Sequence, residues 1–344
     1  ISACLVGSEM CIRDSNLPAG NLRDGHDFIN SDLAVKIRKS VLDGSYKYCN
    51  RVSCSFIAGD NLPTKDEARE HPFFRDVIDN NRTELDTIHR MSLALDQSCN
   101  LSCPSCRSEV IIEKGEALDW RMRVTRDVIL PMLKNVDTLQ MAGYGEFAMS
   151  EPCRLILAAV TQEEYPNLKF DLITNGLMFD RGFWQRYPNA QGMIRQVRVS
   201  VDGATKETYE RLRRGGKFVN IQKNLEFLAE LHRKGEIPEL SILFVYQLDN
   251  FREMKQMAEW AIALGCKHLY FEKLLDWNSY GSREAYLEKA VHLPGHPLYA
   301  EFRELIADPI FSHPIVVRDW VTDEPGFYDT RHIAFLPLAL RGLD

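Results

Sequence analysis

The feature that most constrains this chain is an alternation of strand-like and helix-like segments that runs from residue 88 to residue 271. Short runs rich in β-branched and aromatic residues alternate with stretches whose apolar residues recur every three or four positions. The predicted strands are 88–95, 138–142, 170–174, 197–201, 240–246 and 268–271. The predicted helices are 118–135, 151–163, 181–187, 206–213, 219–234 and 251–264. This alternation predicts an α/β fold with a parallel sheet, curled or open, joined by right-handed crossovers.

Three closely spaced cysteines follow the first predicted strand. Cys99, Cys103 and Cys106 form a C-x3-C-x2-C pattern, at the carboxyl end of a strand, where ligands bind in parallel sheets. Three thiolates in eight residues can hold three irons of a cubane and leave the fourth iron without a protein ligand. A structural zinc site needs four closed ligands, and no partnering cysteine or histidine pair lies nearby. The pattern favours a 4Fe-4S cluster over zinc or three structural cysteines.

Polar segments also follow the next three predicted strands. These segments are Gly143-Tyr144-Gly145-Glu146, Thr174-Asn175-Gly176 and Ser200-Val201-Asp202-Gly203, and Arg213 ends the helix after the last of them. Glycines allow a backbone to approach a ligand closely, and a carboxylate accepts hydrogen bonds from an ammonium group. Taken singly, each segment also fits an ordinary turn, and an arginine in this position also fits a solvated helix end.

Together, in this order and at strand ends, the cysteine pattern and these segments resemble the radical S-adenosylmethionine superfamily from Ile88 to Asp276. The resemblance implies a partial (β/α)6 TIM-like barrel and a cluster held by the three cysteines. It also implies that the open iron binds S-adenosylmethionine. Reductive cleavage then gives a 5′-deoxyadenosyl radical, which abstracts a hydrogen atom from the substrate.

The resemblance also implies S-adenosylmethionine contacts along these segments. Residues 143–146 correspond to the glycine-rich motif that meets the methionine amino group, with Glu146 as acceptor, and 174–175 correspond to a turn of the family. Ser200 and Asp202 correspond to a ligand-contacting segment, and Arg213 suits the ligand carboxylate through bidentate hydrogen bonds.

One position departs from the family pattern, which places an aromatic residue just before the third cysteine. This chain has Ser105 there. Stacking on adenine would then have to come from elsewhere, for example from Tyr144 or Phe147.

The amino-terminal part has a different character from the core. Residues 1–15 resemble translated sequencing adapter, and we treat them as non-native, so Cys4 and Cys11 carry no predicted role. The alternative is a genuine amino-terminal tail whose cysteines help to bind metal. A helix is expected from Ser31, which caps it, to Gly44. The predicted domains are 1–15, a small module with its linker at 16–84, a core at 85–275 and a carboxyl-terminal extension at 276–344, to which the sequence assigns no role.

A second cysteine pair follows this helix. The run from Asn21 to Cys54 resembles the latter part of a SPASM-type auxiliary-cluster module, with Cys49 and Cys54 as ligands of an auxiliary iron-sulfur cluster. Two cysteines cannot close a cubane, so the module is truncated here, and it precedes the core rather than following it. A remnant of a zinc knuckle and free thiols are the alternatives. The isolated Cys153 and Cys266 fit small buried hydrophobic side chains.

The overall composition excludes some classes of partner. The formal net charge of -7 argues against a general nucleic-acid binder, and no apolar run approaches the roughly 20 residues of a membrane span. Without a secretory signal, the expected location is the cytoplasm. The expected partners are a low-potential electron donor and an unidentified substrate, either a peptide or protein or a small molecule.

The leading hypothesis is therefore a radical S-adenosylmethionine enzyme of oxidoreductase or maturase type. Candidate acid–base groups near the strand ends are Asp202, Glu272 and Asp276, the second of which also fits a paired structural carboxylate. The alternatives are an iron-sulfur protein that transfers electrons or senses redox state, and a zinc-stabilised interaction module. The missing fourth cysteine counts against an electron carrier, because a carrier binds all four irons through protein ligands.

Overall fold

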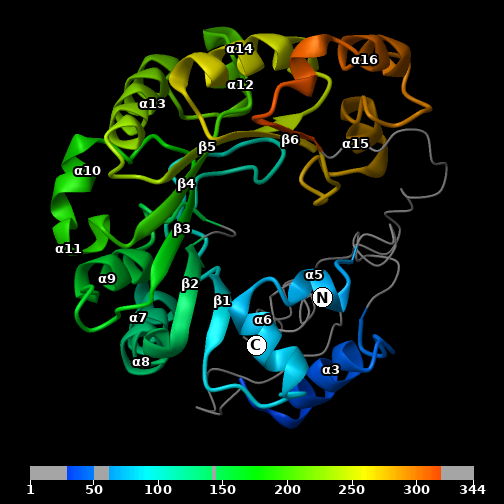
Figure 1. Ribbon diagram of the computed structural model, residues 1–344. Coiled ribbons are helices and arrows are strands. Elements are labelled where there is room, and N and C mark those ends of the chain that lie inside the picture. The colour runs from blue at the N-terminus through cyan, green and yellow to red at the C-terminus, as the bar shows by residue number, and fades with distance from the viewer. Residues whose placement is uncertain (1–28, 50–61, 142–144, 319–344) are drawn as a thin grey trace. The chain divides into compact units, whose positions relative to one another are not determined.

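The structure is a computed structural model that describes residues 29–49, 62–141 and 145–318 (Figure 1). The chain divides into two compact units. Unit 1 contains the described parts of Ile1–Asn100, Ile111–Arg198 and Glu230–Glu239. Unit 2 contains those of Leu101–Val110, Val199–Ala229 and Leu240–Asp344. The chain therefore passes from one unit to the other within the cysteine loop and again within the fourth strand.

Seven strands follow one another in chain order. They are β1 (Ile88–Leu93), β2 (Val136–Met141), β3 (Lys169–Thr174), β4 (Ile194–Ser200), β5 (Glu239–Tyr246), β6 (His268–Lys273) and β7 (Val316–Arg318). Their order in the sheet is the order in the chain, and β1 pairs with β2, β2 with β3, β5 with β6 and β6 with β7 in parallel. Among the described residues β1 and β7 are edge strands, so the sheet is open.

The helices lie between these strands and before β1. Those before β1 are α3 (Asp32–Leu42), α5 (Lys65–Ala68) and α6 (Pro72–Asp79). Between β1 and β4 they are α7 (Gly115–Val124), the π-helical turn η2 (Thr125–Ile129), α8 (Leu130–Met132), η3 (Leu133–Asn135), α9 (Glu151–Ala159), α10 (Arg181–Arg186) and α11 (Pro188–Gln191). After β4 they are α12 (Lys206–Leu212), α13 (Phe218–Arg233), η4 (Phe251–Glu253), α14 (Met254–Leu264), α15 (Arg283–Lys289), α16 (Tyr299–Leu305) and η5 (Pro309–Ser312).

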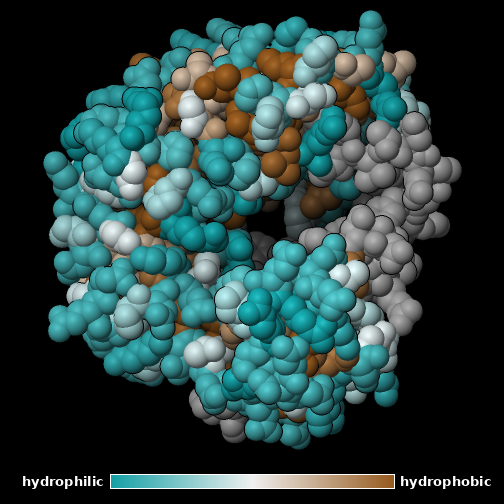
Figure 2. Space-filling view, viewed as in Figure 1, coloured by the Kyte–Doolittle hydropathy of each residue, from teal (hydrophilic) through white to brown (hydrophobic). Residues whose placement is uncertain are grey.

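In unit 1 the two faces of the sheet differ in chemistry. Leu139, Met141, Phe170 and Leu172 alternate along β2 and β3 and are fully buried, and Figure 1 shows α7 to α11 on one side of these strands. Burying a large apolar side chain of this kind contributes about 1.5–3 kcal/mol. The solvent side of these helices is largely hydrophilic (Figure 2). The alternate residues of the strands point to the other face, which carries Thr138, Gln140 and Asp171 together with Val136 and Ile173.

Unit 2 is built around an aromatic core at β5 and β6. The ring of Phe244 on β5 lies 5.5 Å from that of Phe271 on β6, which in turn packs against Phe311 of η5. Tyr246 stacks on Phe302 of α16 with the ring centroids 5.2 Å apart. The segment after β6, to which the sequence assigned no role, thus supplies part of this core. None of the described helices is both long and apolar enough to cross a membrane.

The predicted α/β class with a parallel sheet is confirmed, and the bounds differ in places. The sheet has a seventh strand, β7, and β4 begins three residues before the predicted 197–201. The helix predicted at 118–135 begins at Gly115 and is broken by the π-helical turn η2. The predicted amino-terminal helix is confirmed as α3, with the Ser31 hydroxyl accepting from the Ala34 amide. The predicted domain boundaries at 84 and 275 stay predictions.

Candidate functional site

The loop after β1 is held by backbone contacts at both ends of the cysteine motif. In unit 1, the Cys99 amide donates to the Ile111 carbonyl at 2.8 Å. In unit 2, the amides of Cys106 and Arg107 both donate to the Cys103 carbonyl at 2.9 Å, which forms a tight turn. Cys103 is buried, Cys99 is partly exposed and Cys106 is exposed. Hydrogen bonds therefore hold the backbone at Cys99 in unit 1 and the turn at Cys103 in unit 2, and the three thiols differ in exposure.

In unit 1, Glu146 joins three of the predicted segments. Its amide donates to the Ser98 carbonyl at 2.8 Å, just before the first cysteine of the motif. Its carboxylate accepts from the Thr174 hydroxyl and from the Asn175 amide, both at 2.6 Å. Glu146 is buried, so these contacts replace water as hydrogen-bond donors. This carboxylate positions the turn after β3 against the cysteine loop, and its predicted contact with an ammonium group stays a prediction.

Gly145 permits the close approach of these two loops. A Cβ at this position would lie 2.7 Å from the Ser98 carbonyl oxygen and 2.8 Å from that of Asp96. Both atoms belong to the backbone and cannot move aside as a flexible side chain would. Only glycine fits here without shifting the cysteine loop.

The Asn175 side chain reaches the first cysteine. Its Nδ2 donates to Asn100 Oδ1 at 2.8 Å and lies 3.9 Å from Cys99 Sγ. An N–H group directed at a thiolate stabilises the negative charge on sulfur. Within unit 1, the structure thus brings together the first cysteine, Glu146, Thr174 and Asn175.

In unit 2, Arg213 lies beside the second cysteine. Its Nη2 pairs with Asp202 Oδ2 at 2.7 Å, and its Nη1 lies 3.8 Å from Cys103 Sγ. The Arg213 side chain is only 12% exposed, so a solvated helix-end arginine is excluded. Its pKa is raised: burial lowers it, but the charges of Asp202, then Cys103 and Tyr209, outweigh that effect. The guanidinium therefore stays charged and faces both a carboxylate and a cysteine sulfur.

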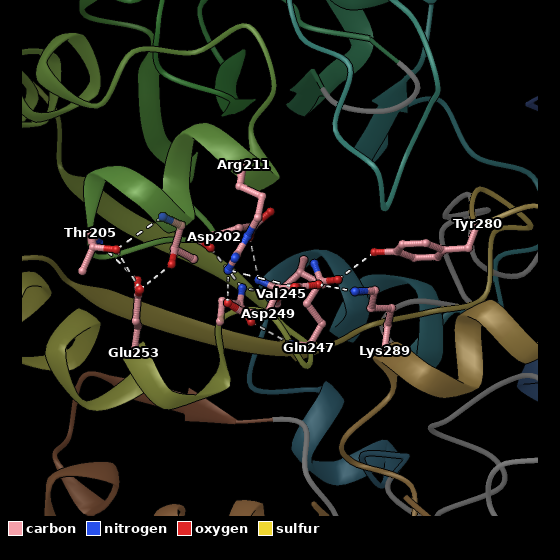
Figure 3. Close-up of polar contacts among 11 residues, drawn as sticks. Asp202, Thr205, Arg211, Val245, Gln247, Asp249, Glu253, Tyr280 and Lys289 are labelled. Carbon is pink, nitrogen blue, oxygen red and sulfur yellow. Dashed lines mark hydrogen bonds and ion pairs between the residues drawn. The ribbon is translucent and has the colours of Figure 1, made fainter.

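A polar network holds the loop after β4 in place within unit 2 (Figure 3). The Asp202 Oδ1 accepts from the Val245 amide at 2.8 Å, and Asn250 Nδ2 donates to the Asp202 carbonyl at 3.0 Å. Glu253 accepts from the Ala204 amide at 2.7 Å and from the Thr205 hydroxyl at 2.8 Å. Sequence reasoning missed Asn250 and Glu253. The loop and the start of α12 are therefore fixed by residues about 50 positions further along the chain.

The same view shows two further contacts beyond β5 (Figure 3). The Tyr280 hydroxyl donates to Gln247 Oε1 at 2.7 Å, and Lys289 pairs with Asp249 at 2.8 Å. Burial, followed by the charges of Asp249 and Asp202, raises the pKa of Tyr280, so it stays protonated. These contacts tie Tyr280, which precedes α15, and Lys289, the last residue of α15, to the loop after β5.

The structure gives the burial and the contacts of four further residues that the sequence singled out. Ser200 is buried at the end of β4, and Asp276 pairs with Arg283 at 3.2 Å. Glu272 is partly exposed on β6. Phe147 is buried against the rings of Phe179 and Phe183. The suggestion that Phe147 stacks on adenine is therefore wrong, because its ring belongs to the hydrophobic core.

The isolated cysteines are buried, as predicted. Burial raises the pKa of the Cys153 and Cys266 thiols to about 12, so both stay protonated near neutral pH. Such thiols act as small apolar side chains.

The remaining predicted ligands are described only in part. Cys49 is partly exposed, and its amide donates to the Tyr46 carbonyl at 3.0 Å. Cys54, Gly143 and Tyr144 lie outside the described residues. Within the described ranges, no group of three His, Cys, Asp or Glu side chains converges closely enough to hold a metal ion. The ligand assignments stay predictions from the sequence.

Comparison with known proteins gives matches to solved structures alone. No protein family matches the chain, and no curated protein does. Streptococcus suis SuiB bound to S-adenosylmethionine matches with 14% identity over 86% of this chain and 66% of SuiB, at a TM-score of 0.49. The structure of anSMEcpe with bound AdoMet matches with 18% identity over 67% of this chain and 61% of that one, at a TM-score of 0.40. TYW1 with a lysine-pyruvate adduct matches with 11% identity over 64% of this chain and 74% of that one, at a TM-score of 0.42.

Proposed function

We propose that this chain is a radical S-adenosylmethionine enzyme whose cluster is held by Cys99, Cys103 and Cys106. The observation that carries the proposal is the set of contacts in unit 1, where Glu146 and Asn175 from two strand ends meet the loop of a C-x3-C-x2-C motif. When bound, a 4Fe-4S cluster with one open iron supplies the electron for reductive cleavage of S-adenosylmethionine to a 5′-deoxyadenosyl radical.

The donors beside the cysteines fit such a group. Cluster thiolates carry negative charge, and second-shell donors to sulfur stabilise it and tune the metal. Asn175 Nδ2 lies 3.9 Å from Cys99 Sγ, and Arg213 Nη1 lies 3.8 Å from Cys103 Sγ. In each unit, the side chain that reaches a cysteine is itself fixed by a second polar partner, Asn100 or Asp202. These contacts orient the donors before any ligand arrives.

The proposed roles of the remaining residues follow from their positions at the strand ends. We assign Gly143, Tyr144, Gly145 and Glu146 to the amino group of S-adenosylmethionine, the first two from the sequence alone. Thr174 and Asn175 hold the Glu146 carboxylate. Ser200, Asp202 and Arg213 form the corresponding part of unit 2. Arg213 Nη2 pairs with Asp202 and Nη1 lies beside Cys103 Sγ, so a ligand carboxylate would share these donors or use Nε, which is buried without a hydrogen bond among the described residues.

The finer assignments are also proposals. We assign Cys49 and Cys54 to an auxiliary iron-sulfur cluster, from the resemblance of residues 21–54 to a SPASM module. A low-potential electron donor and a substrate that is either a peptide or protein or a small molecule fit the same resemblance, and the cytoplasmic location stays a proposal from the sequence. The reaction type, oxidoreductase or maturase, depends on the substrate.

The proposal is tested by anaerobic reconstitution with iron and sulfide, followed by titration with S-adenosylmethionine. We expect a broad visible absorption from the cluster and, after reduction, an electron paramagnetic resonance signal that changes shape when S-adenosylmethionine is added, because an open iron accepts the ligand. A cluster whose irons are all bound by protein ligands would give a signal that S-adenosylmethionine leaves unchanged, as an electron carrier does. Zinc without iron would contradict the proposal directly.

A further inference from the structure

The polar face of the sheet in unit 1 carries a row of charged side chains that the proposed chemistry does not use. Arg90 on β1, Gln140 on β2, Asp171 on β3 and Arg195 on β4 contact one another across four strands. The register places Gln140 directly opposite Asp171 and Arg90 one diagonal position away. On β2 and β3 the opposite face is the apolar one, whereas on β4 the buried Val197 and Val199 share the face of Arg195. The charged row therefore lies next to apolar side chains at its β4 end.

Both arginines bind the same carboxylate oxygen. Arg90 Nη2 lies 3.0 Å from Asp171 Oδ2, and Arg195 Nη2 pairs with that same atom. Two guanidinium groups on one carboxylate give these three residues a net charge of one positive unit. A lone buried carboxylate would need only one arginine, so the second creates an excess that favours an anion.

The guanidinium groups keep donors directed away from Asp171. The Asp171 side chain is 2% exposed, whereas those of Arg90 and Arg195 are 41% and 38% exposed. Among the described residues, Nη1 of each arginine makes no hydrogen bond, and Arg195 Nε is a buried donor without a partner. Planar forks with open N–H pairs match the geometry of a carboxylate. Asp171 thus holds both arginines in place and leaves some of their N–H donors for a ligand.

The row and the contacts beside the cysteine loop share strand β3, so their separation can be measured along that strand. Asp171 precedes Thr174 by three residues on β3, which corresponds to about 10 Å along a strand. Thr174 in turn contacts Glu146 beside the cysteine loop. Because side chains alternate along a strand, Asp171 and Thr174 point to opposite faces, so only the distance along β3 relates the row to the cysteine loop.

We propose that Arg90 and Arg195 form a subsite for a carboxylate group of the substrate. That the ligand is a substrate rests on the proposed function, whereas the carboxylate site itself does not. Asp171 is the positioning residue: it orients both guanidinium groups and competes with the ligand for them. The ligand class is a carboxylic acid, either a free acid or an acidic or carboxyl-terminal residue of a peptide.

The test is isothermal titration calorimetry of the reconstituted full chain with glutarate. Glutaramide, its neutral counterpart, and inorganic phosphate serve as comparison ligands. We expect glutarate to bind and glutaramide not to bind. Arg195→Gln should weaken glutarate binding about tenfold or more, since a charge-assisted hydrogen-bond pair is lost. Arg154→Gln, a partly exposed arginine on α9 in the same unit, should leave binding unchanged.

A second variant distinguishes a ligand subsite from a row of ion pairs that serves only the fold. Asp171→Asn removes the competing carboxylate, so glutarate should bind several-fold more tightly than to the unchanged chain. The proposal is overturned if Arg195→Gln and Asp171→Asn both leave glutarate affinity unchanged, or if phosphate binds more tightly than glutarate. Because these measurements need no S-adenosylmethionine, glutarate binding without any cleavage activity would overturn the proposed function and leave the subsite standing.

Discussion

Replacing Cys99, Cys103 and Cys106 together with alanine is expected to remove the iron that these residues bind after reconstitution. The physical reason is that these three thiolates hold three of the four irons of the cubane, and the N–H groups that Asn175 and Arg213 direct at the cysteines are donors that cannot replace them. Iron and sulfide content and the visible absorption of the reconstituted protein give the measurement.

The matched control for the triple variant is Cys266→Ala. Cys266 is buried, and burial raises its thiol pKa to about 12, so it is a poor ligand and its loss should leave the iron content unchanged. Iron remaining at Cys49 and Cys54 would separate the auxiliary site from the core site. An unchanged absorption spectrum and iron content in the triple variant would show that the motif does not bind the cluster.

Replacing Arg213 with methionine is expected to lower the free energy of unfolding by about 3–5 kcal/mol, because breaking a buried ion pair leaves an uncompensated charge. The charge left behind is that of Asp202, whose Oδ2 lies 2.7 Å from Arg213 Nη2. Urea denaturation near pH 7 measures the loss.

The neighbouring Arg211 provides a control on the same helix. Its side chain is 56% exposed, lies 4.0 Å from the Asp249 carboxylate and donates to the Asp249 carbonyl at 2.8 Å, so Arg211→Met should cost only about 1 kcal/mol. The double variant Asp202→Asn with Arg213→Met should recover part of the loss, since the buried carboxylate is then neutral. If Arg213→Met and Arg211→Met lower the free energy of unfolding equally, the buried pair is no more stabilising than the exposed one.

The sequence predicted the alternation of strands and helices well, because β2, β3 and β5 are continuous apolar or alternating runs. It missed β7, whose three residues, Val316–Arg318, are too short to show a period. It also placed the start of β4 late, because Arg195 and Gln196 follow one another without alternation at the beginning of that strand.

For the site, the rule that ligands bind at strand ends was enough to group the cysteine loop with Glu146 and Asn175. The pairing of Arg213 with Asp202 could not be predicted, since it depends on where α12 ends relative to the loop after β4. Asn250 and Glu253 were missed for a similar reason. They read as ordinary polar residues at a helix start, and only the fold turns them toward the loop that they hold.

The row of Arg90, Asp171 and Arg195 could not be predicted from the sequence for another reason. Each residue is a single charge in its own strand, and only the register of neighbouring strands brings the three together.

The measurement that tests the central claim most directly is the production of 5′-deoxyadenosine. The reconstituted chain would be reduced anaerobically with S-adenosylmethionine, and the product identified by mass spectrometry. The account predicts 5′-deoxyadenosine from the unchanged chain and none above background from the variant in which Cys99, Cys103 and Cys106 are alanine. A fully loaded cluster that yields no 5′-deoxyadenosine, or equal yields from the chain and the variant, would contradict it.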